Sequence, residues 1–551
     1  MTSKKNKNHL PHNTEKSVEI ATEVAISKEE TRSKTWLHFL KEDWIGLVLL
    51  ILSIIGAYIM SIVGDGFYQG EEAHHYVNMK SFWDNPNVIL GAAVKTGYKI
   101  LFVIPAYFGQ TATRITQCIV VGLIAYFTYR VAKIKKLDYP FLAFFLFASA
   151  CLWTGVSYRY YPEVLGALLL ILALFLYYQY PKSIHWAAMV FGYLLIVRGE
   201  MMFVAVIFFA YLVFKKEWKA ILFMGIFPFL YNLWGFIVHG DLLFMINSQS
   251  QYAAQVKNSY QKAGFDHYFL MSGIIFGYIS VIGSVLYLVF CVIRKIKVDW
   301  MIVIPFAVFF FVQCLINWKE RNILTSTGGN IRYMMSISPL VVLMAMMGFQ
   351  KLFEIKNRFL YLFFLIPIIA FIGYAQTYDH NWIERAKWLP RDFTPLYFAA
   401  PFALFLVLPI RNKHVYFSGI ILAAIVSTFL FMKPIKLIDS GENHTAKEIV
   451  DWVKKNNFQD TRTIYQNLPT FNYFFDRTPE DYKMGNFAMN EDVLEKSKVG
   501  SIVIWDSHFA QKFSKVEKKY FDERPNKYLL LDQKLSPDRR VEFYIYERIN
   551  N

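Results

Sequence analysis

Charged residues are scarce in this sequence. They make up 18% of its 551 residues, whereas about a quarter is usual for a soluble protein. Hydrophobic residues reach 55%, and the mean hydropathy is +0.30. This composition argues against a soluble globular protein and favours a chain that lies largely within a membrane.

Cysteine is scarce too. All four cysteines lie in apolar runs, and the polar C-terminal region has none: they are Cys118, Cys151, Cys291 and Cys314. A disulfide framework is therefore excluded, and cysteine usage does not indicate a cellular compartment.

Acidic residues are too few to balance the basic ones, so the formal net charge is +16. Residues 437–551 contain nearly equal numbers of both signs, which places the basic excess in the N-terminal tail and in short loops between apolar runs. Such a distribution indicates membrane topology rather than a nucleic-acid surface. We therefore expect no nucleic-acid partner.

The apolar residues form long runs separated by short charged loops. About thirteen of these runs have the roughly 17 to 25 residues that a membrane-spanning helix needs. They cover residues 44–63, 111–130, 140–156, 162–179, 185–198, 200–214, 220–238, 268–293, 300–317, 333–350, 359–375, 395–410 and 415–432. We predict a polytopic α-helical membrane protein with about thirteen transmembrane helices.

Composition divides the chain into three regions. Residues 1–43 are predicted to be a disordered basic tail. Residues 44–435 form the transmembrane region, whose first outer loop covers 64–110. Residues 436–551 are polar, and we predict that they form a small α/β domain.

Secondary-structure patterns support that last prediction. Residues 444–456 carry apolar side chains at helical spacing, whereas residues 501–505, 528–531 and 541–546 have the composition of strands.

Lysine and arginine gather in five loops, near residues 133–136, 215–219, 294–297, 356–358 and 411–413. With thirteen spans and a cytoplasmic N-terminus, all five loops lie in the cytoplasm, as the positive-inside rule requires. The α/β domain is then extracytoplasmic. We expect an integral protein of the bacterial inner membrane.

The stretch directly after the first predicted span is dense in ionisable residues. It holds three carboxylates and two imidazoles, from Asp65, Glu71, Glu72, His74 and His75. Desolvation at the membrane interface perturbs the pKa of such groups and makes a carboxylate usable as a base. A solvated loop with ordinary acidic residues and a divalent-metal site are the two alternatives.

Three further ionisable groups fall at predicted outer ends of spans. They are Arg159 with Glu163, Arg198 with Glu200, and Arg332 with Tyr333, which follows a Gly328-Gly329 turn. Ionisable residues near membrane depth are costly and often functional, although a helix-dipole partner, an ion pair or a snorkelling arginine is the structural alternative. All groups face the side of the acidic loop, so together they suit a base and a phosphate site.

These features resemble the GT-C superfamily of integral membrane glycosyltransferases, which take sugars from polyprenyl-phosphate carriers. The first outer loop is most similar to the mannosyltransferases that build GPI anchors and dolichol-linked oligosaccharides, and to their prokaryotic relatives. In their motif, Asp65, Gln69, Glu72 and His75 stand at the Asp, Gln, Glu and His.

Two positions depart from that motif, since Gly64 replaces its proline and Gly66 replaces its second acid. In an alternative alignment, Glu71 and Glu72 are the acidic pair found in protein O-mannosyltransferases and aminoarabinose transferases. Asp65, Glu71 and Glu72 therefore all remain candidates for the catalytic base.

The resemblance implies an inverting transfer of a hexose, with mannose favoured, from a polyprenyl-phosphate donor to a glycan, lipid or protein acceptor. One of the three candidate carboxylates takes the proton from the acceptor hydroxyl. The residues expected to bind donor phosphate or substrate are His75, Arg159, Glu163, Arg198, Glu200, Arg332 and Tyr333. A transporter or flippase of lipid-linked sugars, and a surface-polysaccharide polymerase or ligase, are the alternative functions.

Overall fold

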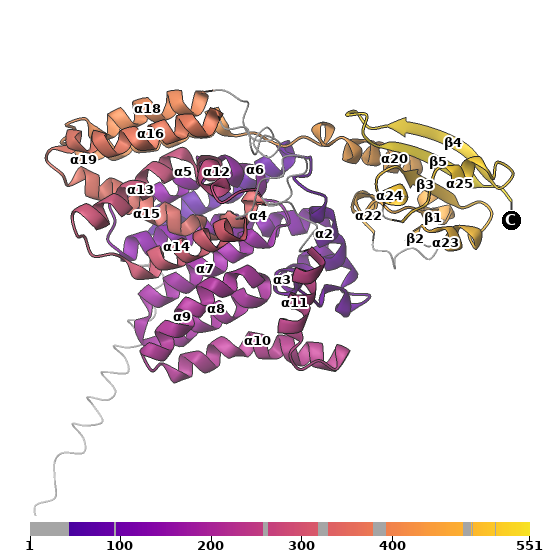
Figure 1. The fold of residues 1–551 in the computed structure, drawn as a ribbon, viewed down its shortest axis with the longest axis horizontal. Coiled ribbons are helices and arrows are strands. Elements are labelled where there is room, and N and C mark those ends of the chain that lie inside the picture. The colour runs from indigo at the N-terminus through magenta and orange to yellow at the C-terminus, as the bar shows by residue number, and fades with distance from the viewer. Residues whose placement is uncertain are drawn as a thin grey trace, which may run out of the picture.

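A bundle of helices is followed by a smaller region that contains a β-sheet (Figure 1). The computed structural model describes residues 43–92, 95–256, 263–317, 329–377, 393–477, 486–487, 489–512 and 514–550. Residues 1–42 of the predicted disordered tail lie outside this set, whereas Asp43, its last predicted residue, instead begins the helix Asp43–Val63 and is buried.

Seven helices among the described residues are long and apolar enough to cross a membrane. They are Asp43–Val63, α4 (Gln110–Ile134), α7 (Pro162–Gln179), α10 (Trp218–His239), η4 with α15 (Ile331–Ile337, Ser338–Phe353), η5 with α16 (Arg358–Tyr361, Leu362–Thr377) and α19 (Lys413–Phe431). Shorter apolar helices are η2 with α8 (Pro181–Ser183, Ile184–Val197), η3 with α9 (Gly199–Met201, Met202–Phe214), α14 (Trp300–Ile316) and α18 (Thr394–Val407). The chain is therefore an integral membrane protein of the predicted fold class, and the count of thirteen spans stays a prediction.

The structure divides two of the predicted spans. The one over 268–293 consists of α12 (His267–Phe276) and α13 (Tyr278–Ile293), which are bent by 117°. Gly277 makes this turn with a φ of 83°, a conformation that side chains disfavour. The span over 140–156 is likewise divided, into α5 (Leu142–Ala148) and α6 (Cys151–Val156).

Glycines allow α13 and α15 to pack closely. A Cβ atom added at Gly348 would lie only 2.0 Å from the carbonyl oxygen of Gly283. Small residues at such a crossing let two helix backbones approach each other. This packing holds α15, and with it η4, against the core of the bundle.

Basic loops meet at one end of the bundle. Lys135 forms an ion pair with Asp299, and Lys413 Nζ lies 2.5 Å from Asp138 Oδ1. The basic loops near 133–136, 294–297 and 411–413 therefore share one side, as predicted from the sequence. Which side of the cell membrane this is stays a prediction.

The predicted first outer loop is mostly helical, with α2 (Glu71–Ser81), η1 (Pro86–Ile89) and α3 (Thr96–Tyr107). Together with α11 (Phe244–Val256), it lies at the end of the bundle that faces the sheet-containing region (Figure 1). This end carries the candidate site.

The C-terminal region has a five-stranded mixed sheet in the order β2-β1-β3-β5-β4. Its elements are η7 (Leu437–Ser440), α20 (Glu442–Lys455), α21 (Phe458–Thr461), β1 (Ile464–Tyr465), α22 (Thr470–Phe475), β2 (Asn486–Phe487), α23 (Glu491–Glu495), β3 (Ile502–Asp506), α24 (Phe509–Lys512), α25 (Lys519–Asp522), β4 (Tyr528–Leu535) and β5 (Glu542–Arg548). β1 pairs in parallel with β2 and β3, whereas β5 pairs antiparallel with β3 and β4. The predicted small α/β fold is confirmed.

Side chains alternate along the central strand β3. Ile502 and Ile504 join a core with Ile449 of α20, whereas Val503 and Trp505 join a second core on the opposite face. Because successive strand residues point to opposite faces, the buried side chains of β3 pack against helices on both faces of the sheet.

Candidate active site

The helix α2 begins with two adjacent carboxylates. Glu71 and Glu72 occupy its first turn, where the positive end of the helix dipole favours negative charge. Because residues four apart share a helix face, Glu71 lies with His75, and Glu72 lies with Tyr76. The two carboxylates therefore meet different partners.

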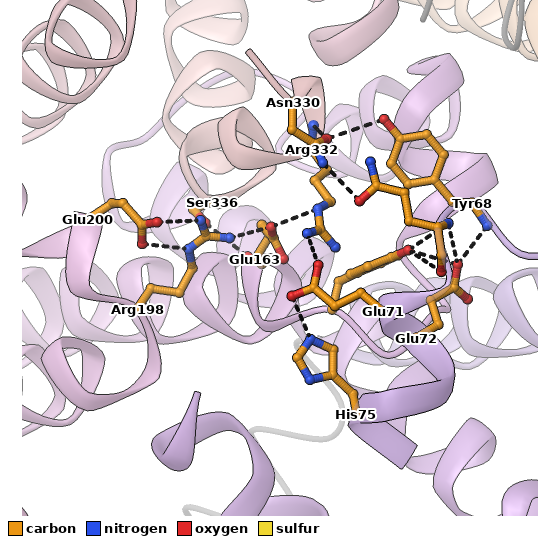
Figure 2. Close-up of polar contacts among 12 residues, drawn as sticks. Tyr68, Glu71, Glu72, His75, Glu163, Arg198, Glu200, Asn330, Arg332 and Ser336 are labelled. Atoms are coloured by element: carbon orange, nitrogen blue, oxygen red, sulfur yellow. Dashed lines mark hydrogen bonds and ion pairs between the residues drawn. The ribbon is translucent and has the colours of Figure 1, made fainter. Parts of the chain in front are cut away.

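Glu71 ends a row of alternating charges (Figure 2). Arg332 Nη2 contacts Glu71 Oε2, and Arg332 Nε lies 3.3 Å from Glu163 Oε1. Arg198 Nη1 contacts the same Glu163 oxygen, and its Nη2 lies 3.3 Å from Glu200 Oε1. We call these five residues the charge row; it joins four segments that are far apart in the sequence.

Local structure explains how the charge row is placed. Pro162 starts α7 and sets Glu163 in its first turn. Arg198 follows α8, where the backbone becomes extended. Asn330 caps η4 by accepting a hydrogen bond from the backbone N–H of Arg332 at 3.2 Å.

Burial makes the charge row sensitive to the loss of any of its three buried members. The side chains of Glu163 and Arg198 are 1% exposed, and that of Arg332 is 4% exposed. A buried charge that loses its partner costs several kcal/mol, roughly 3 to 5. Because the charges alternate in sign along the row, each of these three side chains contacts a side chain of opposite charge.

Aromatic rings flank both arginines. The guanidinium carbon of Arg332 lies 4.2 Å from the centre of the Tyr161 ring, and that of Arg198 lies 4.8 Å from the Tyr333 ring. Such cation–π contacts fix the planes of the guanidinium groups. Tyr333, predicted as a binding residue, thus packs against Arg198 of the charge row.

Glu72 belongs to a second, more enclosed cluster. Its carboxylate lies 3.2 Å from Arg159 Nη1, and Tyr161 O–H donates to it at 2.8 Å. The backbone N–H of Tyr68 donates to it at 2.7 Å. Arg159 also donates to the carbonyl oxygens of Gly66 and Gly155, so this pair holds the outer loop against the bundle.

The structure places Asp65 apart from the charge row. Asp65 is exposed, and its carboxylate accepts a hydrogen bond from the Leu437 N–H at 2.8 Å. A Cβ atom at Gly66 would lie 2.3 Å from the carbonyl oxygen of Lys436. A side chain at position 66 would therefore collide with the backbone of Lys436, and the hydrogen bond to Leu437 makes Asp65 an attachment point for the C-terminal region.

Accessibility separates the four carboxylates around the charge row. The side chain of Glu71 is 37% exposed, compared with 24% for Glu200, 5% for Glu72 and 1% for Glu163. Glu71 therefore offers the most accessible carboxylate that also contacts a buried arginine.

The surroundings of Glu71 keep it ionised. Burial opposes this ionisation, but the charge of Arg332 and the contact with His75 outweigh burial and hold the pKa of Glu71 well below its usual range. Burial lowers the pKa of His75 to about 4, so its ring is neutral at neutral pH. His75 Nε2 lies 3.4 Å from Glu71 Oε1 and orients it without adding charge.

Two lysines of the outer loop lie near the charge row and were not predicted as site residues. Lys99 interacts electrostatically with Glu71, and Lys95 with Glu200. Lys99 is 1% exposed, and burial lowers its pKa to about 7. A lysine within an apolar stretch such as 96–107 is the signal that identifies it in the sequence.

Asn330 was also missed. Besides capping η4, its Nδ2 donates to Gln69 Oε1 at 3.1 Å, and Tyr68 O–H donates to its Oδ1 at 3.3 Å. It thus ties the segment of Arg332 to the first outer loop. An asparagine directly before an apolar run such as 331–350 is a helix-capping signal that the sequence does contain.

The described residues lend no support to the divalent-metal alternative, and they include only one glycine of the Gly328-Gly329 turn. Within them, no group of three or more His, Cys, Asp and Glu side chains could hold a metal ion. Of the glycine pair, Gly328 lies outside the described residues, whereas the carbonyl oxygen of Gly329 lies 2.5 Å from His267 Nε2.

No family model matches the sequence, and no curated protein matches it. Two crystal structures of ArnT from Cupriavidus metallidurans do match the fold. The structure bound to undecaprenyl phosphate has a TM-score of 0.59 and 9% identity, and the match covers 91% of this chain and 98% of ArnT. The apo structure has a TM-score of 0.56 and 10% identity, with coverages of 92% and 98%.

The chain has the fold of ArnT. The match spans nearly all of both chains, so it includes the helical bundle and the C-terminal α/β region. The predicted fold class, a polytopic helical membrane protein with a small C-terminal α/β region, is confirmed by this likeness. The closer similarity to mannosyltransferases of GPI and dolichol pathways stays a prediction.

Proposed function

We propose that this protein is an inverting glycosyltransferase that moves a hexose from a polyprenyl-phosphate donor to an acceptor hydroxyl at the outer face of the membrane. The observation that carries the proposal is the pairing of an accessible carboxylate, Glu71, with a buried guanidinium, Arg332. The fold of ArnT, which has been crystallised with undecaprenyl phosphate, supports the choice of donor.

Glu71 is the proposed base. It takes the proton from the acceptor hydroxyl while that oxygen attacks the anomeric carbon of the donor. The bond between this carbon and the phosphate oxygen breaks, and its electron pair leaves with the polyprenyl phosphate. Glu71 suits the role better than Glu72 or Asp65, because Glu72 is enclosed by its partners and Asp65 contacts the C-terminal region.

Arg332 and Lys99 are the proposed cations for the departing phosphate. Among the described residues, Nη1 of Arg332 is buried and meets no hydrogen-bond acceptor. A buried donor without a partner is costly, and a phosphate oxygen would satisfy it. The guanidinium of Arg332 is held in place by the rest of the charge row, which consists of Arg198, Glu163 and Glu200.

An apolar groove between α12, α13, α14 and α16 suits the polyprenyl tail. It has a volume of about 430 Å³ and is lined by residues that include Phe276, Val281, Phe310 and Ile368. The groove borders α12, whose residue Tyr268 donates its O–H to the carbonyl oxygen of Asn330 at 3.3 Å. Its walls therefore continue toward the segment that carries Arg332.

The sugar and acceptor are carried over from the family resemblance, and the orientation from the distribution of the basic loops. Mannose is the favoured sugar, and the acceptor is a glycan, a lipid or a protein. The site faces the extracytoplasmic side of a bacterial inner membrane, with the N-terminus in the cytoplasm.

The experiment that tests the proposal uses purified full-length protein and a panel of acceptors. Two donors are compared: polyprenyl-phosphate mannose and polyprenyl-phosphate aminoarabinose. We expect a mass increase of the acceptor by one sugar, release of polyprenyl phosphate, and an anomeric configuration opposite to that of the donor by NMR.

Two outcomes would contradict the proposal. Retention of the anomeric configuration would require a covalent intermediate instead of a single displacement. Movement of intact donor across vesicle membranes, with no release of polyprenyl phosphate in any donor–acceptor combination, would favour the flippase.

A further inference from the structure

The face of α2 that points away from Arg332 is occupied by the C-terminal region. The Tyr76 O–H donates to Asp476 Oδ1 at 2.5 Å, and Lys80 Nζ lies 3.0 Å from the same oxygen. Lys80 also donates to the backbone carbonyl oxygen of Asp476. Asp476 directly follows α22 and adopts a left-handed conformation, with a φ of 55°.

Aromatic rings extend this contact toward the start of the outer loop. The ring of Tyr473 in α22 lies 5.0 Å from Phe67 and 5.6 Å from Tyr76, in edge-to-face arrangements. Gln110 Nε2 donates to the carbonyl oxygen of Tyr473 at 2.5 Å. Buried aromatic contacts of this kind favour one relative position of the two elements.

The contact reaches the enclosed cluster around Glu72. Tyr473 lines a cavity of about 30 Å³ together with Asp65, Glu72 and Arg159. A cavity of that size holds about one water molecule. A side chain from the C-terminal region therefore completes the wall around Glu72.

A second attachment lies where the chain enters the C-terminal region. The Gly66 N–H donates to the carbonyl oxygen of Ile435 at 2.9 Å, and Asp65 accepts from Leu437. The loop before α2 and the far part of α2 are therefore both tied to residues beyond 434.

We propose that α22 and Asp476 form a clamp that holds α2 against the bundle, and that Asp476 and Tyr473 are positioning residues for Glu71. The proposal rests on the proposed function, because it names the residues that orient its base. α2 is fixed by Arg332 and Arg159 on the bundle side and by the clamp on the other. Loss of the clamp lets Glu71 move away from the acceptor hydroxyl, and a displacement of about 1 Å costs up to about 100-fold in rate.

The test uses full-length Asp476→Ala, which removes both side-chain contacts. Asp476→Asn keeps an acceptor oxygen for Tyr76 and tolerates the left-handed backbone, and Tyr76→Phe removes one hydrogen bond only. Asp460→Ala is the matched control, because Asp460 also forms an ion pair in the C-terminal region and is 48% exposed, compared with 45% for Asp476.

Two readouts are measured for each variant: hydrogen exchange of residues 65–81, and kcat and KM for the sugar donor. We expect Asp476→Ala to increase exchange in α2 and to lower kcat at least about tenfold, with KM within about twofold. Asp476→Asn should recover most of kcat, Tyr76→Phe should be intermediate, and Asp460→Ala should match the wild type.

Unchanged exchange of α2 in Asp476→Ala would overturn the clamp, whether or not the protein transfers sugar. Increased exchange with an unchanged kcat would overturn the positioning role. Absence of transfer by the wild type with every donor would instead overturn the proposed function, since the exchange measurement does not depend on activity.

Discussion

The charge row depends on Glu163, which lies between two arginines. Its carboxylate oxygen contacts both Arg198 and Arg332, and its side chain is 1% exposed. The sequence suggested a role for Glu163 as a helix-dipole partner or a binding residue. The structure shows it as the shared counter-ion of the two guanidinium groups.

We predict that Glu163→Gln lowers the free energy of unfolding by about 3 kcal/mol, because it leaves two buried guanidinium groups with one carboxylate fewer. Thermal unfolding of the purified protein in detergent measures this. Glu354→Gln is the control, since Glu354 is 48% exposed and pairs only with Lys351 among its described ion-pair contacts; its effect should stay within about 0.5 kcal/mol. Equal unfolding temperatures for both variants would contradict the account.

Lys99 gives the site a dependence on pH. Burial lowers the pKa of Lys99 to about 7, so its charge is present below this pH and is lost above it. Attraction for the donor phosphate weakens accordingly, and we predict that KM for the donor rises between pH about 6 and about 8. In Lys99→Arg the charge persists throughout this range and the rise should vanish. The same pH curve for both proteins would exclude Lys99 from phosphate binding.

At the scale of elements, the contact between α13 and α15 holds η4 and Arg332 in place. We predict that Gly348→Ala destabilises the protein by about 1 to 3 kcal/mol, because its Cβ would lie 2.0 Å from the Gly283 carbonyl oxygen. Gly225→Ala in α10 is the control, since no atom lies within 4 Å of its added Cβ. Both are compared by thermal unfolding in detergent, and equal stability of the two variants would show that α13 and α15 separate at no cost.

Most elements of the fold could be predicted from hydropathy and spacing. Long apolar runs such as 111–130 and 415–432 match α4 and α19 closely, and the strand predicted over 501–505 matches β3 within one residue at each end. The break at Gly277 could not be predicted in this way, because the residues on both sides are equally apolar. Its cause is a backbone conformation, which hydropathy does not record.

The residue types of the candidate site could be predicted from the sequence, but not which of these side chains contact each other. Arg198, Glu200 and Arg332 were expected on one side, and the structure brings them into the charge row. Asp65 matched an acidic position of the family motif in the sequence. In the structure it contacts Leu437, which lies more than 350 residues away along the chain. Long-range contacts of this kind leave no local signal in a single sequence.

The whole molecule has two chemically different ends. Basic loops lie at one end, whereas the outer loop with α2 and the C-terminal region lie at the other (Figure 1). The charge row meets α2 at Glu71. With the basic end in the cytoplasm, we predict that the C-terminal region is extracytoplasmic. A periplasm-dependent reporter fused after Asn551 should be active in bacterial cells, and a reporter that works only in the cytoplasm should be silent there. The reverse pattern would invert the topology.

The central claim is that Glu71 and Arg332 form the chemical centre of a sugar transfer reaction. The most direct measurement compares the initial rate of polyprenyl phosphate release from a polyprenyl-phosphate hexose by the wild type and by Glu71→Gln, both reconstituted in lipid. Because glutamine cannot accept the proton, we predict a rate lower by about 100-fold or more when both proteins are assayed below their unfolding temperatures. Equal rates for the two proteins would contradict the account.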